Sequence, residues 1–432
     1  MTVDYDVLVV GAGIAGEEAS LNLAEMGYKV LLVEKGPSIG GKMVLLSKTF
    51  PTLDCASCIS TPKMAATYHH PNITLITCAE VTEAVRKEDG SFKVRLLQKP
   101  RYINESACTG CQQCEINCPV MIPDEFNFGL TVRKAAYIPF STAIPQKAVI
   151  DIDNCIICGA CEKVCPAGCI DFTQTPQEIE YTVGSVILST GFELFDAERK
   201  VQYGYKRYKN VITAMQMERL LAPTRPYNTV LRPSDGKVPD NIAFILCTGS
   251  RDNTVENPAC SRVCCMYSFK HTQLLMGILP LADITLYYMD IRAFGKGYEE
   301  FFQQTKAMGA FLVKGRSARI EENEIGNLIL HYEDIDNGGV KKQAEHDLVV
   351  LSIGLLPNTE ITGAFKKDKL LLDDFHFIKE VDEDMHPGKT SIEGVFIAGT
   401  SSGPMDIPDT ILHAAAAATH SAAHVEKIKR GR

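Results

Sequence analysis

The sequence predicts an α/β protein with two Rossmann-like lobes built on parallel sheets, into which a small α+β iron–sulfur domain of the bacterial 2[4Fe–4S] ferredoxin type is inserted. Three observations support this fold class. A glycine-rich strand–turn–helix opens the chain, apolar strands alternate with helical stretches in its second half, and two cysteine runs of identical spacing lie between these parts.

The opening segment, DVLVVGAGIAGEEASLNLAEMGYKVLLVEKG (6–36), has the strand–glycine turn–helix–strand order of a dinucleotide-binding βαβ unit. Gly13 lets the backbone approach a pyrophosphate at the helix N-terminus, and Glu34 at the end of the second strand can accept hydrogen bonds from ribose hydroxyls. The candidate cofactor-binding residues are Gly11, Gly13, Gly16, Glu34, Lys35, Gly40, Gly41, Lys42, Gly191, Gly399, Asp406 and Ile407.

Further apolar strands are predicted within residues 185–196, 241–250, 284–291, 347–358 and 394–423. The last of these segments continues into an Ala-rich helix, whose start is marked by Pro408 and Asp409. This helix N-terminus is expected where the chain re-enters the nucleotide site.

The domains are expected to be nested. We predict a dinucleotide-binding domain from residues 1–100, 173–215 and 345–432, the iron–sulfur insert at 101–172, and a second lobe at 216–344.

Composition limits the classes of function and of partner that the chain can have. The net charge is −9 and no basic block stands out, which makes nucleic acid an unlikely partner. No signal peptide precedes the first strand and no apolar run is long enough for a membrane span, so we expect a soluble, cytoplasmic protein. Sixteen cysteines in such a protein favour metal or redox chemistry over disulfides.

The two cysteine runs, CTGCQQCEINCP (108–119) and CIICGACEKVCP (155–166), both match C-x₂-C-x₂-C-x₃-C-P. In this pattern three thiolates hold one [4Fe–4S] cube and the fourth crosses to the other. The first cluster is therefore assigned to Cys108, Cys111, Cys114 and Cys165, and the second to Cys155, Cys158, Cys161 and Cys118. The alternative, a zinc ribbon, would need only two separated pairs.

Four more cysteines, Cys247, Cys260, Cys264 and Cys265, lie within nineteen residues and indicate a third metal site, although buried free cysteines are the alternative. Cys247 closes the strand after which a second dinucleotide motif would begin. Only TGSRDN follows it, so a nicotinamide site is poorly supported.

Cys55 and Cys58 form a C-x₂-C pair shortly after the Gly40–Gly41 turn. They are candidates for a redox-active pair facing a flavin, for half of a cluster site, or for an inert structural pair. The remaining Cys78 and Cys169 are interpreted as small buried hydrophobic residues.

Together these motifs resemble the A subunit of heterodisulfide reductase over almost the whole chain. The segments that carry the resemblance are GAGIAG (11–16), TFPTLDCASCISTPKM (49–64), PDEFNFGLTVRKAAYIPF (123–140), CTGSRDN (247–253), CSRVCCMYS (260–268) and AGTSSGPMDIPD (398–409). The resemblance implies a thioredoxin-reductase-like FAD protein that transfers electrons between flavin and clusters in a soluble anaerobic complex, with electron bifurcation as a family capability. It also implies a further [4Fe–4S] cluster at the four cysteines from Cys247 to Cys265.

Longer family members carry an N-terminal domain before the FAD fingerprint and a second ferredoxin domain after the last helix. In them Cys55 and Cys58 would join cysteines of that N-terminal domain around another cluster. The implied partners are proteins like the B and C subunits of heterodisulfide reductase, a carrier linked to hydrogenase or formate dehydrogenase, or ferredoxin, with the chain as a homodimer in a larger assembly.

Three alternatives stay open. The chain could be the flavin subunit of a quinone-interacting or class II benzoyl-CoA reductase complex. It could be a stand-alone NAD(P)H-dependent flavin disulfide reductase that uses Cys55 and Cys58. The third alternative is non-enzymatic, a redox sensor or scaffold.

Overall fold

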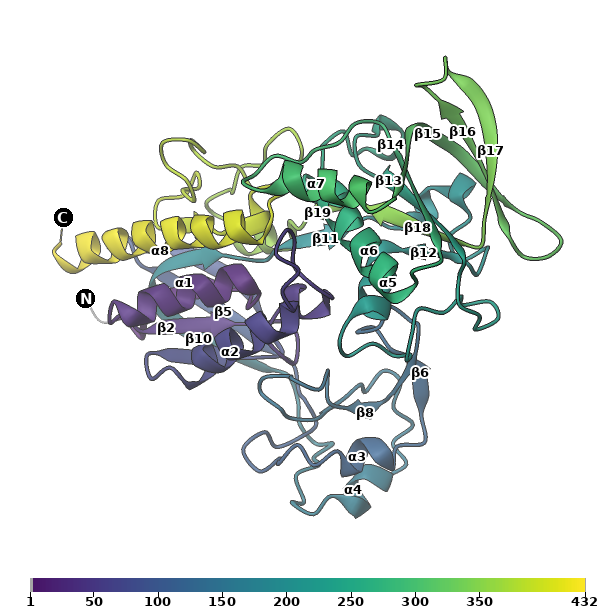
Figure 1. Ribbon diagram of the computed structural model, residues 1–432. Coiled ribbons are helices and arrows are strands. Elements are labelled where there is room, and N and C mark those ends of the chain that lie inside the picture. Colours follow the sequence, from purple (N-terminus) through teal and green to yellow (C-terminus); the bar gives the residue numbers. More distant parts are fainter. Residues whose placement is uncertain (1–2, 432) are drawn as a thin grey trace. The chain divides into compact units, whose positions relative to one another are not determined.

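The computed structural model describes residues 3–431. The chain forms two compact units, each built around its own sheet (Figure 1). The first unit comprises the chain up to Val44, Ile59–Phe192, and the chain from Pro357 onward; the second comprises Leu45–Cys58 and Glu193–Leu356.

The first unit contains the predicted βαβ unit. Its sheet has the order β3-β2-β1-β10-β5-β4, with β20 also paired to β10. The strands are β1 (Tyr5–Val10), β2 (Val30–Val33), β3 (Ile73–Ile76), β4 (Ala79–Arg86), β5 (Phe92–Gln98), β10 (Gln177–Leu188) and β20 (Val395–Ile397), and the helices are α1 (Ile14–Glu25), α2 (Ala56–His69), whose first turn belongs to the second unit, and α8 (Ile407–Lys429).

The sheet is mixed rather than wholly parallel. β1, β2, β3, β10 and β20 are parallel. β5 pairs antiparallel with the first half of β10, and β4 pairs antiparallel with β5. The sequence of β5 alternates buried Phe92, Val94 and Leu96 with more exposed residues. This pattern is typical of antiparallel strands with one solvated face.

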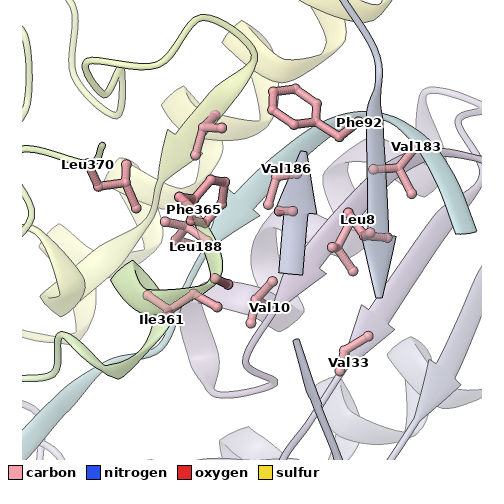
Figure 2. Close-up of a cluster of buried hydrophobic side chains, with 14 of the residues drawn as sticks. Leu8, Val10, Val33, Phe92, Val183, Val186, Leu188, Ile361, Phe365 and Leu370 are labelled. Atoms are coloured by element: carbon pink, nitrogen blue, oxygen red, sulfur yellow. The ribbon is translucent and has the colours of Figure 1, made fainter. Parts of the chain in front are cut away.

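One hydrophobic cluster of this unit is built on alternate residues of its strands, such as Leu8 and Val10 of β1, and the intervening Val7 and Val9 are also buried. Figure 2 shows side chains of β1, β5 and β10, such as Leu8, Phe92 and Val186, gathered with Ile361 and Phe365 from the segment that precedes β20.

Helix α8 packs closely against α1 because its buried residues are mostly small, and the two helices lie side by side in Figure 1. Asp406 caps α8 by accepting a hydrogen bond from the Asp409 backbone at 2.9 Å. The helix thus begins at Ile407, one residue before the Pro408 that marks its predicted start.

The iron–sulfur insert belongs to the first unit. It consists of α3 (Gln113–Ile116), α4 (Ala160–Val164), β6 (Met121–Pro123), β7 (Val132–Lys134), β8 (Ala136–Tyr137) and β9 (Val149–Ile150). Such short elements bury little apolar surface. Cysteine side chains make up much of the insert's core, together with residues such as Ile103, Ala135 and Ile150.

The second unit has a sheet of order β12-β18-β13-β14-β15-β16-β17. Its strands are β12 (Val211–Thr213), β13 (Asn241–Thr248), β14 (Asp283–Tyr288), β15 (Phe311–Glu322), β16 (Leu328–Asp334), β17 (Val340–His346) and β18 (Leu348–Ile353), and its helices are α5 (Ala214–Leu221), α6 (Cys264–Ile278) and α7 (Tyr298–Ala307). Two short strands, β11 (Phe192–Leu194) and β19 (Leu355–Pro357), pair where the chain passes between the units.

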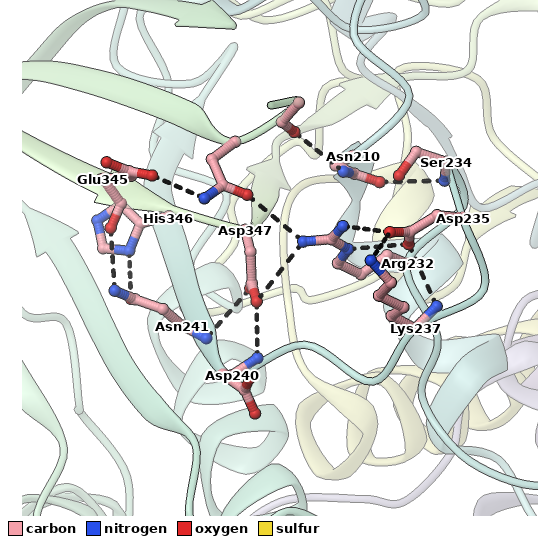
Figure 3. A network of polar contacts seen from close by, with 12 residues as sticks. Asn210, Arg232, Ser234, Asp235, Lys237, Asp240, Asn241, Glu345, His346 and Asp347 are labelled. Carbon is pink, nitrogen blue, oxygen red and sulfur yellow. Dashed lines mark hydrogen bonds and ion pairs between the residues drawn. The ribbon is translucent and has the colours of Figure 1, made fainter. Parts of the chain in front are cut away.

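The second unit reaches further than the predicted boundaries of 216–344. The prediction places β18 in the dinucleotide-binding domain, but β18 pairs with β12 on one side and β13 on the other. A polar network at the start of β13 fixes this arrangement (Figure 3): the Asp347 carboxylate accepts hydrogen bonds from the backbone of Asp240 at 2.8 Å and Asn241 at 3.1 Å. Residues 193–215 and 345–356 therefore group with the second sheet.

Among residues 3–431, no helix combines the length and apolar character that crossing a membrane requires.

Candidate dinucleotide site and cysteine clusters

In the glycine turn between β1 and α1, the start of the helix lies very close to the backbone at the end of the strand. A Cβ atom on Gly16 would lie 1.9 Å from the Gly11 carbonyl oxygen, so only glycine lets α1 pack this closely on the end of β1. Gly13 is the N-cap residue of α1 and leaves the helix N-terminus open toward a ligand.

A second backbone segment faces this turn. A Cβ atom on Gly41 would lie 2.7 Å from the Cα of Gly13, so Gly41 has no room for a side chain against the fingerprint. The Glu34 carboxylate accepts hydrogen bonds from the backbone of Ala12 and Gly36, both at 2.8 Å. Bare backbone at a helix N-terminus with an oriented acid beside it fits the pyrophosphate and ribose of a dinucleotide.

The other predicted cofactor-binding residues belong to the same unit. The Gly191 backbone donates to the Ser401 hydroxyl at 2.9 Å, and the Gly399 backbone donates to Nδ1 of His413 at 2.9 Å. Ile407 is the first residue of α8, directly after Asp406. The bond from Gly191 joins the end of β10 to the loop that leads into α8.

The two predicted lysines behave differently from each other. The Lys42 ammonium donates to the Phe192 carbonyl and lies 4.8 Å above the Phe192 ring. Lys35 makes an exposed ion pair with Glu360 at 3.3 Å, and its side chain is 57% exposed. Lys35 is therefore a solvated surface residue in this structure.

Sequence reasoning missed Glu17, in the first turn of α1. It is fully buried, and neither carboxylate oxygen has a hydrogen-bond partner among the described residues. Burial, opposed by Lys63 and reinforced by Glu34, raises the pKa of Glu17 to about 8. Glu17 is thus a mostly neutral acid at pH 7 beside the fingerprint.

The cysteines of the insert surround two separate hollows. One is lined by Cys108, Cys111, Cys114 and Cys165, and the other by Cys155, Cys158, Cys161 and Cys118. Each hollow thus contains three cysteines of one run and the fourth of the other, the same grouping that the ferredoxin pattern predicts. This donor set, four sulfur atoms around a space within a loop, fits a [4Fe–4S] cube.

Cys169 is buried, as its interpretation as a small hydrophobic residue requires. However, it also lines the first hollow, and its sulfur atom lies 3.4 Å from that of Cys165. A thiol at this distance can donate a weak hydrogen bond to a ligand sulfur, and such bonds help to set cluster potentials. The sequence carries a signal for this role, because the second run alone is followed by a cysteine four residues after its last ligand.

Within residues 3–431, no three His, Cys, Asp or Glu side chains are arranged to share one metal ion. The cluster assignments therefore depend on the cysteine spacing and on the two hollows.

The cysteines of the third group, Cys247, Cys260, Cys264 and Cys265, also lie close to one another. Cys247 is the penultimate residue of β13 and has a left-handed conformation (φ +58°), while Cys264 and Cys265 lie in the first turn of α6, where both are buried. A hydrogen bond from Cys264, with help from Arg251, lowers the pKa of Cys247 to about 7 although burial acts in the other direction. One helix accommodates the adjacent Cys264–Cys265 pair because successive side chains point in directions roughly 100° apart.

Cys55 and Cys58 lie in the second unit and are joined as a disulfide at the start of α2, with their Cα atoms 5.2 Å apart. A disulfide is one state of a redox-active pair.

A buried charge network holds the segment that carries this pair. Glu218 of α5 accepts hydrogen bonds from the backbone of Ser47 at 2.8 Å and from its hydroxyl at 2.6 Å. The same carboxylate binds the ammonium of Lys270 on α6, which in turn donates to the Lys48 carbonyl at 3.0 Å. Glu218 therefore ties residues 45–58 to the helix that begins at Cys264.

Two family models match the chain. Residues 6–98 match the model described as FAD dependent oxidoreductase, and residues 94–170 match the 4Fe-4S dicluster domain. These ranges cover the glycine fingerprint and the two hollows, and they assign FAD and [4Fe–4S] clusters as the cofactors of the chain.

Solved structures show the same fold. Thioredoxin reductase from T. acidophilum aligns with a TM-score of 0.53 at 15% identity, covering 98% of this chain and 99% of that one. Thioredoxin reductase from Lactococcus lactis aligns with the same TM-score at 13% identity, covering 98% and 100%. The fold is therefore thioredoxin-reductase-like, with the dicluster domain inserted.

Curated relatives are much more similar in sequence. The chain is 46% identical over 420 residues to the iron–sulfur A subunit of CoB–CoM heterodisulfide reductase from Methanocaldococcus jannaschii, covering 96% of this chain and 64% of the relative. It is 45% identical over 424 residues to the A subunit of H₂:CoB-CoM heterodisulfide,ferredoxin reductase from Methanothermobacter marburgensis, covering 98% and 64%. For the A subunit of ferredoxin:CoB-CoM heterodisulfide reductase from Methanosarcina mazei the identity is 44%, covering 96% and 52%.

The chain thus spans between about half and two thirds of the length of these relatives. Identity at this level over nearly all of the chain establishes common ancestry with these A subunits, and the match to the FAD dependent oxidoreductase model indicates an oxidoreductase. Over nearly its whole length the chain is similar to the A subunit of heterodisulfide reductase.

Proposed function

We propose that this chain is the flavin and iron–sulfur electron-transfer subunit of a heterodisulfide-reductase-like complex, and that it passes electrons between FAD and its clusters. FAD accepts and donates electron pairs, whereas each [4Fe–4S] cluster carries one electron at a time. A chain that carries both FAD and [4Fe–4S] clusters can therefore accept an electron pair and pass it on as single electrons. The proposal extends to electron bifurcation at the flavin, which the family resemblance implies.

One observation carries this proposal: the insert is hydrogen-bonded directly to the dinucleotide site. Within the first unit, the Ile144 backbone donates to the Ser38 hydroxyl at 2.9 Å, and the Ile144 carbonyl accepts from the Ile39 backbone at 3.0 Å. Ser38 and Ile39 directly precede the Gly40–Gly41 turn. The insert is therefore fixed to a loop that faces the FAD fingerprint.

In this proposal one cluster of the insert is held by Cys108, Cys111, Cys114 and Cys165 and the other by Cys155, Cys158, Cys161 and Cys118. A third cluster is held by Cys247, Cys260, Cys264 and Cys265. Cys55 and Cys58 act as a redox pair or as half of a further site.

The insert is the proposed docking point for a reduced carrier, ferredoxin, or partners like the B and C subunits of heterodisulfide reductase. Ile116, Ile156 and Ile157 lie close in sequence to cluster cysteines and are 67%, 66% and 63% exposed. Exposed apolar side chains next to cluster ligands in the sequence are candidates for contact with a partner protein. Assembly as a homodimer within the complex is part of the same proposal.

We expect anaerobically purified protein to contain about twelve iron atoms per flavin if all three clusters form, against about eight if only the insert is loaded. Cys264→Ala should then remove about four iron atoms and leave the electron paramagnetic resonance signals of the insert clusters unchanged. Cys78→Ala, which changes a buried cysteine outside the three groups, is the matched control. Equal iron content in Cys264→Ala and the wild type would contradict the third cluster.

We also expect no direct reduction by nicotinamides. The turn after β13 carries the side chains of Ser250 and Arg251 where a nicotinamide-binding lobe has a glycine turn, so a pyrophosphate cannot lie against bare backbone there as nicotinamide binding requires. Anaerobic stopped-flow mixing with NADH or NADPH should leave the flavin oxidised over seconds, while dithionite bleaches it. Bleaching by NADH at a rate compatible with turnover would instead favour the stand-alone reductase alternative.

A further inference from the structure

We propose that the second unit binds a tetrahedral oxyanion of the phosphate class in a pocket beside the turn after β13. The pocket is lined by Lys200, Ser250, Arg251, Asp252, Arg316 and Ser317, with Cys247 at one side. The turn leaves β13 at its carboxyl end, and this edge of a parallel sheet is where α/β proteins place their ligands. The side chains proposed to recognise the anion are not cluster ligands, although Cys247, which also lines the pocket, is a ligand of the proposed third cluster.

The charges of the pocket are not balanced. Lys200 and Arg316 both bind the single carboxylate of Asp252, with the Arg316 guanidinium at 3.3 Å. Arg251 has a partner of its own in Asp290. Among the lysine, arginine and aspartate side chains counted here, one positive charge is therefore in excess. Arg316 is the accessible cation, with 59% of its side chain exposed.

Two hydroxyl groups in the pocket lack partners. Ser250 and Ser317 are 1% and 6% exposed, and among the described residues neither hydroxyl oxygen has a hydrogen-bond partner. A buried hydroxyl without a partner is costly, and nearly all such groups in proteins are satisfied by protein, water or ligand. The Asp252 carboxylate is already engaged by the two cations, so Arg316 and the two hydroxyls are the groups left for a ligand. All three can donate hydrogen bonds, and a ligand with a negative charge and several acceptor oxygens can accept from all of them.

Phosphate-class oxyanions meet this requirement. Their oxygens accept several hydrogen bonds at once, and arginine binds them in a two-pronged geometry. The source is either free phosphate or the phosphate group of a nucleotide. The pocket recognises only the anionic group of its ligand. A nucleotide bound there would therefore not need to donate a hydride.

The test is isothermal titration calorimetry of the full chain with inorganic phosphate and with ADP. The protein is first loaded with FAD so that the dinucleotide site is filled. A titration with sodium chloride at matched ionic strength is the blank. Saturable binding of one equivalent is expected. Arg316→Ala should weaken it by about tenfold or more, and Arg316→Lys by less. Arg319→Ala is the matched control, because Arg319 lies on the same strand, is 57% exposed and pairs with Glu321 outside the pocket.

Tighter binding of ADP than of phosphate would identify a nucleotide as the source, and equal or weaker binding would identify the free anion. The inference is overturned if neither probe binds saturably, or if Arg316→Ala and Ser317→Ala bind as tightly as the wild type. Circular dichroism on each variant checks that the fold is retained.

Discussion

Gly13→Val is expected to yield a folded protein that retains little flavin. The backbone of Gly13 has an ordinary conformation (φ −83°), and a Cβ atom there would meet no heavy atom closer than the Cα of Gly41 at 3.6 Å. The protein itself therefore tolerates a β-carbon. The methyl groups of valine, however, extend into the space over the N-terminus of α1, where the pyrophosphate approaches the backbone.

Overpacking of this kind costs about 1–3 kcal/mol, which corresponds to a loss of flavin affinity of roughly five- to 150-fold. The measurement is the ratio of flavin absorbance to protein after anaerobic purification and dialysis. Gly277→Val in α6 is the control, because a Cβ atom at Gly277 would have no neighbouring atom within 4 Å. An unchanged flavin content in Gly13→Val would refute the assignment of this turn.

Gly16→Ala would be a poorer experiment. Its Cβ would overlap the Gly11 carbonyl and also lie 2.8 Å from the Ser189 hydroxyl. Loss of flavin in that variant would therefore report a damaged fold and not a blocked site.

Glu218→Ala should strongly destabilise the second unit. Glu218 and Lys270 are 2% and 1% exposed, so removal of the carboxylate leaves a buried ammonium without its counter-ion and the Ser47 hydroxyl without its acceptor. Breaking a buried ion pair on one side costs about 3–5 kcal/mol. Chemical denaturation monitored by circular dichroism measures this change in the free energy of unfolding.

The same carboxylate gives a pH dependence of known sign. Burial acts to raise the pKa of Glu218, but the Lys270 ammonium and the hydrogen bonds outweigh it and hold the pKa well below its ordinary value of 4.5. A depressed carboxylate pKa stabilises the fold above the unfolded-state pKa, and this stabilisation is lost as the pH falls below 4.5 toward the folded-state value. The wild type should therefore lose stability in acid more steeply than the variant.

Glu198→Ala is the matched control for this experiment. Glu198 also pairs with a lysine in the second unit, but its side chain is 48% exposed and that of Lys206 is 65% exposed. Exposed pairs contribute about 0–1 kcal/mol. If Glu218→Ala and Glu198→Ala had equal effects on unfolding, the network around Glu218 would not be a stabilising feature.

Most of what identifies this protein is local in sequence and is therefore predictable. The glycine fingerprint, Glu34 and the cysteine runs each fall within a short stretch of chain, because a phosphate turn and a cluster-binding loop are made by neighbouring residues. The crossing of Cys118 and Cys165 between the runs also follows from the pattern, and the hollows of the structure group these residues in the same way.

What the sequence by itself determined was thus the α/β class, the presence of the inserted iron–sulfur domain, and FAD and [4Fe–4S] clusters as the cofactors. The tertiary structure decided which distant residues meet: that β18 belongs to the second sheet, that Cys169 reaches the first hollow, that Glu218 and Lys270 hold the segment of Cys55, and that Arg316 and Ser250 line one pocket. No short motif encodes these contacts. They depend on strand order and on buried electrostatics, in which a residue's partner is chosen by the packing of the whole unit and not by its neighbours along the chain.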